Sequence, residues 1–365
     1  LADHCRALGM HKPLLVTDAG LASLPITQTV LADLQSAGLG AALFADIRPN
    51  PVGANVEAGL AAYRRGGHDG VVAFGGGSGL DIGKLIAFMS GQTRPIWDFE
   101  DIGDWWTRAD PAGIAPIIAV PTTAGTGSEV GRAAVVTDES NHTKKIIFHP
   151  KIMPSIVICD PALSVGMPPK ITAGTGMDAL SHCLEAYCAP GFHPLADGVA
   201  VEGVRLIATA LPRVMQDPSD LDARAEMMAA AAMGATAFQK GLGGMHALAH
   251  PIGALFDSHH GMTNATLMPY VLAFNRHAIE ERIARLAAYL GLPQASFDGF
   301  QAFVLNLRQQ VGVPHTLGEL GVDAHRSDEI AAMAIQDPSA GGNPVQFDLT
   351  AAQSVLAAAF AGRID

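Results

Sequence analysis

Cysteine, charge and long apolar runs are all scarce in this chain of 365 residues, and each scarcity excludes a class of protein. Four cysteines, none in a C-x-x-C pair, are too few for a disulfide framework in a chain of this length. No run of about eighteen apolar residues occurs, so we expect no transmembrane helix and no membrane partner. The first residues lack the basic-then-apolar layout of a signal peptide, which predicts a cytoplasmic protein. Because the chain opens without Met, we expect a short segment to precede Leu1.

Charged residues make up only 16% of the sequence, against 49% hydrophobic residues. This composition excludes a disordered chain, and the length is sufficient for two domains that each bury a core. The balance of 23 Lys and Arg against 35 Asp and Glu gives a net charge of −12, which would repel a nucleic-acid backbone. We therefore expect a folded enzyme-sized protein that binds small molecules and assembles as a homodimer or larger homo-oligomer.

Short apolar runs alternate with helical stretches over the first part of the chain. Each run ends at Asp, Gly or Pro, as is typical of strands buried on both faces of a parallel sheet. The runs cover residues 13–18, 41–47, 70–77, 115–123 and 155–160. This alternation predicts a doubly wound, Rossmann-like dinucleotide-binding domain.

Beyond Asp160 the strand-like runs stop, and long stretches rich in Ala, Leu, Met and Glu follow with helical periodicity. The prolines and glycine of DPALSVGMPPK interrupt any continuous element and indicate a domain boundary. We predict an α/β Rossmann-like domain over residues 1–162 and an all-helical domain over 163–365 that holds the metal and the substrate.

Several metal-ligating side chains recur at helical spacing in the second half. Asp178 and His182 lie four residues apart, as do His246 and His250, and a His-His-Gly sequence with His260 follows. Residues at i and i+4 share one face of a helix, so each pair could converge on an ion. One carboxylate with several imidazoles suits Fe(II) or Zn(II) better than Mg(II) or Ca(II). The alternative is that Asp178 only caps its helix and the histidines are ordinary polar residues.

A glycine-rich turn follows the third apolar run. In GVVAFGGGSGLDIGK the backbone amides at a helix N-terminus could bind a pyrophosphate, presented by Gly75, Gly76, Gly77 and Ser78. The run departs from the G-x-G-x-x-G pattern at Leu80, and such turns also occur for purely geometric reasons.

Two further segments favour a nucleotide site. PTTAGTGSEVG supplies hydroxyl groups from Thr122, Thr123, Thr126 and Ser128. Its glycines Gly125 and Gly127 would allow the backbone to approach a ligand closely. Asp18 ends the first apolar run, where a carboxylate could accept hydrogen bonds from a ribose and repel a 2′-phosphate, which favours NAD over NADP. The alternative is that Asp18 caps the following helix.

Four segments together resemble the iron-dependent, or group III, alcohol dehydrogenase family. They are GGGSGLDIGK, PTTAGTGSEV, GMDALSHCLEAY and HALAHPIGALFDSHHG, in the family's order and across nearly the whole chain. The resemblance implies the fold shared by dehydroquinate synthase and the iron-containing alcohol dehydrogenases. It also implies four metal ligands, Asp178, His182, His246 and His260, with His250 near the nicotinamide.

The resemblance extends to the cofactor contacts and the reaction. It implies contacts to NAD from Asn50, Lys144, Leu163, Gly166 and Met167, besides the glycine turn and the hydroxyl-rich segment. The implied activity is metal-dependent, reversible hydride transfer between an alcohol and NAD, with His250 as the candidate for relaying the alcohol proton.

Two other functions stay open from the sequence. One is a non-redox lyase of the dehydroquinate synthase type, which also uses NAD and a metal but calls for more basic residues than these segments carry. The other is a nucleotide-binding sensor whose metal is structural, because four protein ligands also suit a closed site. His250, which is spare beside the ligands, favours an active site over the sensor.

Overall fold

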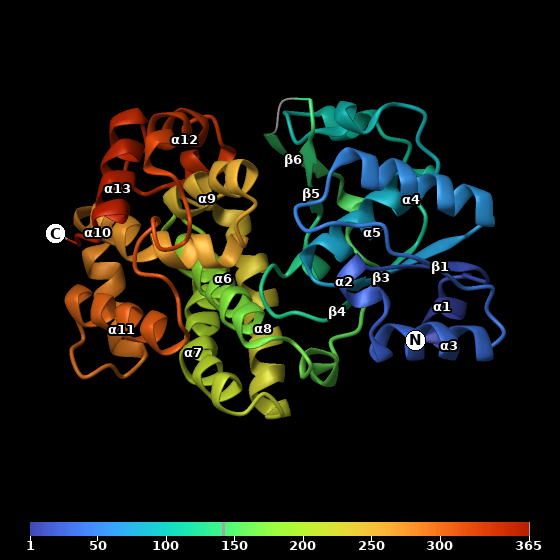
Figure 1. Ribbon diagram of the computed structural model, residues 1–365, viewed down its shortest axis with the longest axis horizontal. Coiled ribbons are helices and arrows are strands. Elements are labelled where there is room, and N and C mark those ends of the chain that lie inside the picture. Colours follow the sequence, from blue (N-terminus) through green and yellow to red (C-terminus); the bar gives the residue numbers. More distant parts are fainter. Residues whose placement is uncertain (141–142, 365) are drawn as a thin grey trace. The chain divides into compact units, whose positions relative to one another are not determined.

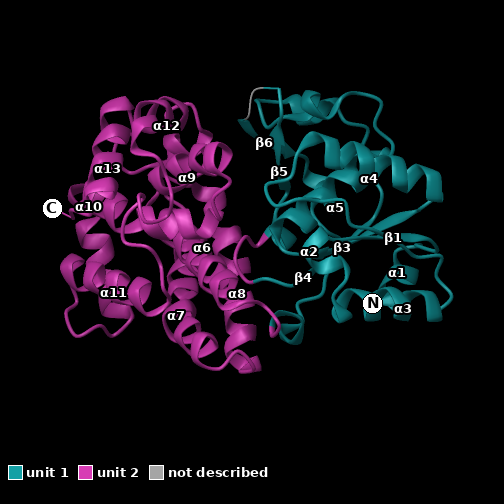
Figure 2. Cartoon of the chain, in the orientation of Figure 1, with its two compact units in different colours: residues 1–123, 128–164 teal, residues 124–127, 165–365 magenta. Residues whose placement is uncertain are grey.

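The computed structural model describes residues 1–140 and 143–364, which form two compact units (Figure 2). Unit 1 comprises residues 1–123 and 128–164, and unit 2 comprises 124–127 and 165–365. The predicted domain boundary between residues 162 and 163 stays a prediction. None of the helices within the described residues combines the length and the apolarity that crossing a bilayer requires.

Unit 1 contains a five-stranded parallel sheet in the order β2-β1-β3-β4-β7. Its strands are β1 (Pro13–Val16), β2 (Ala42–Phe44), β3 (Gly70–Gly75), β4 (Ile117–Pro121) and β7 (Ile156–Val157). Each strand falls in one of the five apolar runs of the sequence. The central strands β1, β3 and β4 are buried at every position, because helices cover both faces of the sheet.

Two hydrophobic clusters lie on the two faces of this sheet. One joins Leu14, Val71 and Ile117 to α4 (Gly53–Gly66) and α5 (Gly77–Met89). The other joins alternate strand residues to α1 (Ala2–Ala7) and α3 (Pro25–Ser36), and Figure 1 shows the same arrangement of helices. The short helix α2 (Ala19–Ala22) follows β1 directly. The layers are those of a doubly wound sheet, as predicted.

An antiparallel hairpin, β5 (Ala133–Asp138) with β6 (Thr143–Phe148), was not predicted from the sequence. Residues of β5 alternate between buried and half-buried, with Ala134, Val136 and Asp138 buried. This period of two is a weaker signal than the continuous apolar runs of the main sheet. Six residues are also few in which to recognise such alternation.

In the part of unit 2 that the structure describes, the regular elements are helices, joined by turns and loops, with no strand. Its helices are α6 (Pro169–Cys188), α7 (Pro194–Gln216), α8 (Leu221–Ala237), α9 (Gly244–Phe256), α10 (His260–Tyr289), α11 (Phe297–Gln310), α12 (Ser327–Ala334) and α13 (Leu349–Ala361). Short 3-10 turns connect several of them. The predicted pairing of an α/β unit with a helical unit is therefore confirmed.

Helix α6 lies at the centre of unit 2, packed against α7, α8 and α10. Every residue from Gly176 to Cys188 is buried, so this helix presents no solvent-facing side over its last three turns. Small residues allow this packing: a side chain at Gly176 would overlap Leu211 of α7. The polar residues of α6 therefore lie inside the protein, where each requires a partner or a ligand.

Candidate functional site

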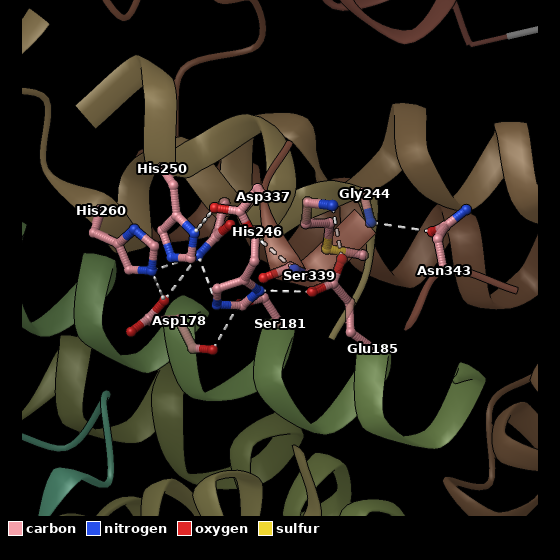
Figure 3. Close-up of polar contacts among 12 residues, drawn as sticks. Asp178, Ser181, Glu185, Gly244, His246, His250, His260, Asp337, Ser339 and Asn343 are labelled. Atoms are coloured by element: carbon pink, nitrogen blue, oxygen red, sulfur yellow. Dashed lines mark hydrogen bonds and ion pairs between the residues drawn. The ribbon is translucent and has the colours of Figure 1, made fainter. Parts of the chain in front are cut away.

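Three of the four predicted metal ligands form a compact buried group in unit 2. Asp178 and His182 lie one turn apart on α6, and His246 lies on α9. All three are at least 95% buried. One ligand atom from each lies within 4.8 Å of the others, and Figure 3 shows Asp178 and His246 facing one another. The i, i+4 spacing on α6 therefore directs the side chains of Asp178 and His182 toward the same point, where one ion could bind both.

The fourth predicted ligand, His260, is the first residue of α10 and lies close to the same group. Its Nε2 is 3.7 Å from Asp178 Oδ1, and a quarter of its side chain is exposed. The preceding residue, His259, points elsewhere: its Nδ1 accepts a hydrogen bond from the backbone N–H of Met262 and so caps α10. Of the His-His pair, only His260 therefore joins the cluster.

One residue that sequence reasoning missed, Asn264, links the predicted ligands. Its Nδ2 lies 3.0 Å from Asp178 Oδ1, 3.2 Å from His246 Nε2 and 3.1 Å from His260 Nε2. Asn264 is one helical turn beyond His260, so the i, i+4 spacing in HGMTN was the signal that could have identified it.

A second missed residue, Glu185, orients His246. Its Oε2 is 2.6 Å from Nδ1 of His246, and its Oε1 accepts the backbone N–H of Met245 at 2.7 Å (Figure 3). The buried carboxylate requires Nδ1 to carry the proton, which leaves the lone pair of Nε2 directed at the cluster. Glu185 lies seven residues after Asp178, on the same face of α6, so a search along that face could have found it.

The two buried imidazoles have opposite electrostatic environments. Burial lowers the pKa of His182 to about 4, an effect that nearby Asp178 only partly opposes. Burial also disfavours charge on His246, but the attraction of Glu185 and its hydrogen bond outweigh burial and raise the pKa. His182 is therefore neutral at physiological pH, as a metal ligand must be.

The residues present fit a borderline divalent cation. Asp178 supplies a carboxylate oxygen, and His182 and His246, whose rings stack with centroids 4.8 Å apart, supply imidazole nitrogens. The three side chains are buried together, where a shared cation would neutralise the carboxylate and accept the nitrogen lone pairs. One carboxylate with neutral imidazoles is the donor set that Fe(II) and Zn(II) accept.

His250 lies beside this cluster rather than within it. Its ring stacks on that of His260, with centroids 5.3 Å apart and planes 10° from parallel. Its Nδ1 is 2.7 Å from Oδ2 of Asp337 (Figure 3), whose other oxygen accepts the N–H of Ser339. Burial would raise the pKa of Asp337, but His250 and these hydrogen bonds lower it overall. Asp337 lies 87 residues along the chain in an irregular segment, so no sequence spacing could have paired the two.

The predicted pyrophosphate turn lies at the carboxyl edge of the parallel sheet in unit 1. Gly75 ends β3 opposite Pro121 of β4, which brings the glycine turn beside the Thr122–Thr123 pair. A side chain at Gly76 would press on Thr123. Gly76 is the N-cap residue of α5, and no side chain among the described residues caps this helix. The backbone N–H groups of Gly77 and Ser78 therefore receive no hydrogen bond from a capping side chain.

Asp18 lies at the same edge, half-buried, and its Oδ1 accepts the backbone N–H of Leu21 at 3.1 Å. It therefore caps α2, which was the alternative considered for it. Its Oδ2 lies next to Gly75, 3.5 Å from where a side chain there would begin. Asp18 thus caps a helix and also borders the glycine turn.

The hydroxyl-rich segment is divided between the units, and its glycines serve packing. Gly125 approaches Thr175 of α6, and Gly127, at φ +61°, approaches Ala231 and Ala235 of α8. These glycines permit contact with helices, where the sequence suggested contact with a ligand. Thr122 is buried, and Thr123 and Thr126 are half-buried.

The Ser128 hydroxyl is held inside unit 1 by two charged residues of α5. It donates to Asp81 Oδ1 at 2.5 Å and accepts from Lys84 Nζ at 2.8 Å. Asp81 also accepts the N–H of Val135 at 2.9 Å, so the network joins α5 to β5. Lys84 is fully buried, and burial lowers its pKa despite the attraction of Asp81. Ser128 thus has a structural role in this network.

The remaining predicted cofactor residues lie elsewhere in the two units. Lys144 of β6 donates to Asn50 Oδ1 at 3.0 Å, so these two are brought together. Leu163 lies in the 3-10 turn Pro161–Ser164 and packs on one face of the sheet. Gly166 is exposed and Met167 is half-buried, both in unit 2.

Comparison with known proteins agrees with this architecture. Residues 1–161 match the family model described as iron-containing alcohol dehydrogenase, and residues 172–360 match the C-terminal model of the Fe-containing alcohol dehydrogenase family. The chain is 40% identical to a 4-hydroxybutyrate dehydrogenase of Cupriavidus necator, over 94% of this chain and 91% of that one.

Two solved structures are also similar. A 1,3-propanediol oxidoreductase superposes with a TM-score of 0.93 at 36% identity, covering 99% of this chain and 95% of that one. A sulfoacetaldehyde reductase of Bifidobacterium kashiwanohense, in complex with NAD+, superposes with a TM-score of 0.87 at 28% identity, covering 98% and 93%. The chain belongs to the iron-containing alcohol dehydrogenase family. It is an NAD-dependent oxidoreductase of the alcohol dehydrogenase class, and its family implies iron and NAD as cofactors.

Proposed function

We propose that Asp178, His182, His246 and His260 hold one divalent iron ion, with zinc as the second candidate. The observation that carries this proposal is the buried group of Asp178, His182 and His246, with ligand atoms within 4.8 Å of one another. The carboxylate of Glu185 behind His246 supports it, because metal-binding imidazoles characteristically donate their other N–H to such a group. The choice of iron is inferred from the family, whereas the affinity of these ligands alone would also allow zinc.

NAD would contact a set of residues at the carboxyl edge of the sheet and in the segments that follow it. The pyrophosphate would bind the glycine turn, where the uncapped first turn of α5 offers N–H groups. Asp18 would face the ribose. The full set is Asp18, Asn50, Gly75, Gly76, Gly77, Ser78, Thr122, Thr123, Thr126, Ser128, Lys144, Leu163, Gly166 and Met167. Among these, Ser128 would act through the position of its segment, because its hydroxyl is engaged with Asp81 and Lys84.

The metal, when bound, supplies Lewis acidity that makes an alcohol hydroxyl easier to deprotonate, and NAD supplies the hydride acceptor. The protein's own groups set the conditions for this chemistry. Glu185 keeps the Nε2 lone pair of His246 directed inward, and burial keeps His182 neutral. Asp337 holds the proton of His250 on Nδ1, so that Nε2 is free to take a proton.

His250 would hand the alcohol proton to solvent. Its side chain is 18% exposed, and it stacks on His260 without joining the ligand set. We expect His260→Ala to lose metal and activity together, whereas His250→Ala should keep its metal and turn over about 100-fold more slowly. Metal content and kcat, measured on the same samples, separate the two roles. A wild-type rate for His250→Ala at every pH would remove the assignment.

The substrate would be a small alcohol, or the corresponding aldehyde in the reverse direction. Relatives named for 4-hydroxybutyrate and 1,3-propanediol make a terminal hydroxyl on a short chain the first class to test. The experiment is NADH formation by the iron- or zinc-loaded protein with short alcohols, diols and hydroxy acids, with and without chelator. Chelator-sensitive NADH formation supports the proposal. If protein that holds metal and NAD forms no NADH with any alcohol, a lyase or a sensor would be favoured.

We propose further that the chain works as a homodimer or larger homo-oligomer in the cytoplasm. Phe192, in the connection before α7, and Leu195, in the first turn of α7, are 95% and 79% exposed, which is costly for large apolar side chains in an isolated chain. The four cysteines are free thiols, as suits a reducing compartment. Light scattering after gel filtration measures the assembly, and a monomer at micromolar concentration would contradict it.

A further inference from the structure

The amide of Asn264 lies where the predicted ligands would direct their lone pairs. Its Nδ2 is within 3.2 Å of one ligand atom from each of Asp178, His246 and His260. The orientation of the amide follows from chemistry: a carboxylate oxygen only accepts hydrogen bonds, so the atom facing Asp178 must be the nitrogen. The amide oxygen, on the other side, is buried and accepts no hydrogen bond from any described residue.

This hydrogen bonding is incompatible with a metal at the same ligand atoms. Glu185 holds the proton of His246 on Nδ1, so Nε2 of His246 has a single lone pair directed at the cluster. That lone pair can accept an N–H from Asn264 or bind a cation, and it cannot do both. The same choice applies to the Nε2 of His260 if it accepts from Asn264.

We propose that Asn264 is a placeholder for the cation, an inference that rests on the metal site proposed above. In the metal-free protein its two N–H groups donate to two of the three neighbouring ligand atoms at a time, and their partial positive charge lies close to the third, which holds α6, α9 and α10 at ligand spacing. Metal binding breaks these hydrogen bonds and displaces the amide. Asn264 therefore stabilises the metal-free protein selectively and acts as an internal competitor of the metal.

The proposal is tested by Asn264→Leu, which keeps the branched shape of the side chain and removes its donors. Thr266→Val on the same helix is the matched control, because the Thr266 hydroxyl donates to the Met262 carbonyl of its own helix and, among the described residues, to no ligand of the site. The affinity for Zn(II) is measured by competition with a chromogenic chelator. Tm is measured for the metal-free and Zn(II)-loaded forms. Asn264→Ala repeats the measurement in case the leucine variant does not fold.

We expect Asn264→Leu to lower the Tm of the metal-free form and leave that of the Zn(II)-loaded form near the control. Because the lost hydrogen bonds belong to the metal-free form alone, its Kd for Zn(II) should fall about tenfold. Thr266→Val should leave Kd unchanged. An unchanged or raised Kd in both Asn264 variants would overturn the proposal, since it would place the amide's contribution equally or mainly in the metal-bound form.

The failure of this inference can be distinguished from failure of the metal site. Zn(II) uptake by the parent that persists after Asp178→Ala, or no uptake by the parent, would refute the site itself and the placeholder with it. Uptake that depends on Asp178 but weakens in Asn264→Leu would refute the placeholder alone.

Discussion

Replacing Glu185 by Gln is the sharpest test of how the protein prepares the metal site, because it changes one atom and no shape. The carboxylate accepts two N–H groups, from the Met245 backbone at 2.7 Å and from His246 Nδ1 at 2.6 Å. A glutamine has one acceptor oxygen, which the fixed backbone N–H would take. Its NH2 group would then face Nδ1 of His246, and the imidazole proton would have to move to Nε2, the atom predicted to bind the metal.

The magnitude follows from the interaction that is lost. A hydrogen bond to a charged group contributes about 1.5–3 kcal/mol, and about 2 kcal/mol corresponds to roughly a 30-fold change in an equilibrium constant. Substitutions behind metal-binding imidazoles typically weaken metal binding about 10- to 100-fold, in the same range. We therefore expect the Kd of Glu185→Gln for Zn(II) or Fe(II) to rise about 30-fold, with kcat falling only through lost metal.

The assay is competition with a chromogenic chelator, and Glu202→Gln is the control. Glu202 lies on α7 of the same unit, bound to Arg205 at the surface, so its loss should leave metal affinity unchanged. A Kd for Glu185→Gln within about threefold of the parent would refute the reasoning, because it would mean that the tautomer of His246 does not depend on this carboxylate.

Three further predictions concern stability and are checked by urea unfolding. Lys84→Met should destabilise unit 1 by roughly 3 kcal/mol, because it leaves the Asp81 carboxylate without its buried partner; a loss under about 1 kcal/mol would mean the pair contributes little. Gly127→Ala should cost more than Gly9→Ala, because both residues have positive φ but only Gly127 meets neighbouring helix atoms, and equal losses would refute the packing argument. Burial and nearby Lys151 lower the pKa of His149 below its ordinary 6.5, and its neutral Nδ1 accepts the N–H of Lys151. The unfolded chain therefore takes up this proton first, so stability is complete above pH 6.5 and declines as the pH falls toward the folded pKa; His149→Asn should flatten that decline, and an unchanged slope would contradict it.

Much of the fold could be predicted from the sequence because its signals are local. Five continuous apolar runs predicted the five strands of the parallel sheet, and helical periodicity predicted the second unit. The hairpin β5–β6 was missed because its alternation is short and half-buried. Gly125 and Gly127 were interpreted as room for a ligand, yet Gly125 contacts α6 and Gly127 contacts α8. Both helices are remote in the sequence from these glycines, so no local pattern could have predicted the contacts.

The candidate site divides in the same way. Asp178 with His182 shares one helix face, as does His246 with His250, and the spacing alone placed each pair together. Glu185 lies on the same face of α6 as Asp178, and Asn264 lies one turn beyond His260 on α10, so helical spacing could have predicted both residues. Asp337 reaches His250 only through the tertiary fold, which no spacing records. Asp18 could not be assigned one role from the sequence, because a carboxylate that caps a helix and one that faces a ribose have the same sequence signature.

The division of PTTAGTGSEVG between the units makes the chain cross from one unit to the other three times, at residues 123–124, 127–128 and 164–165. Unit 2 is consequently not a continuous piece of the polypeptide, and cutting the gene near residue 164 would separate it from four of its own residues. Those residues include Gly125 and Gly127, which pack against α6 and α8. Anyone grafting this helical unit onto another nucleotide-binding unit would therefore need to transplant two segments, the helical unit and a short loop encoded upstream of it.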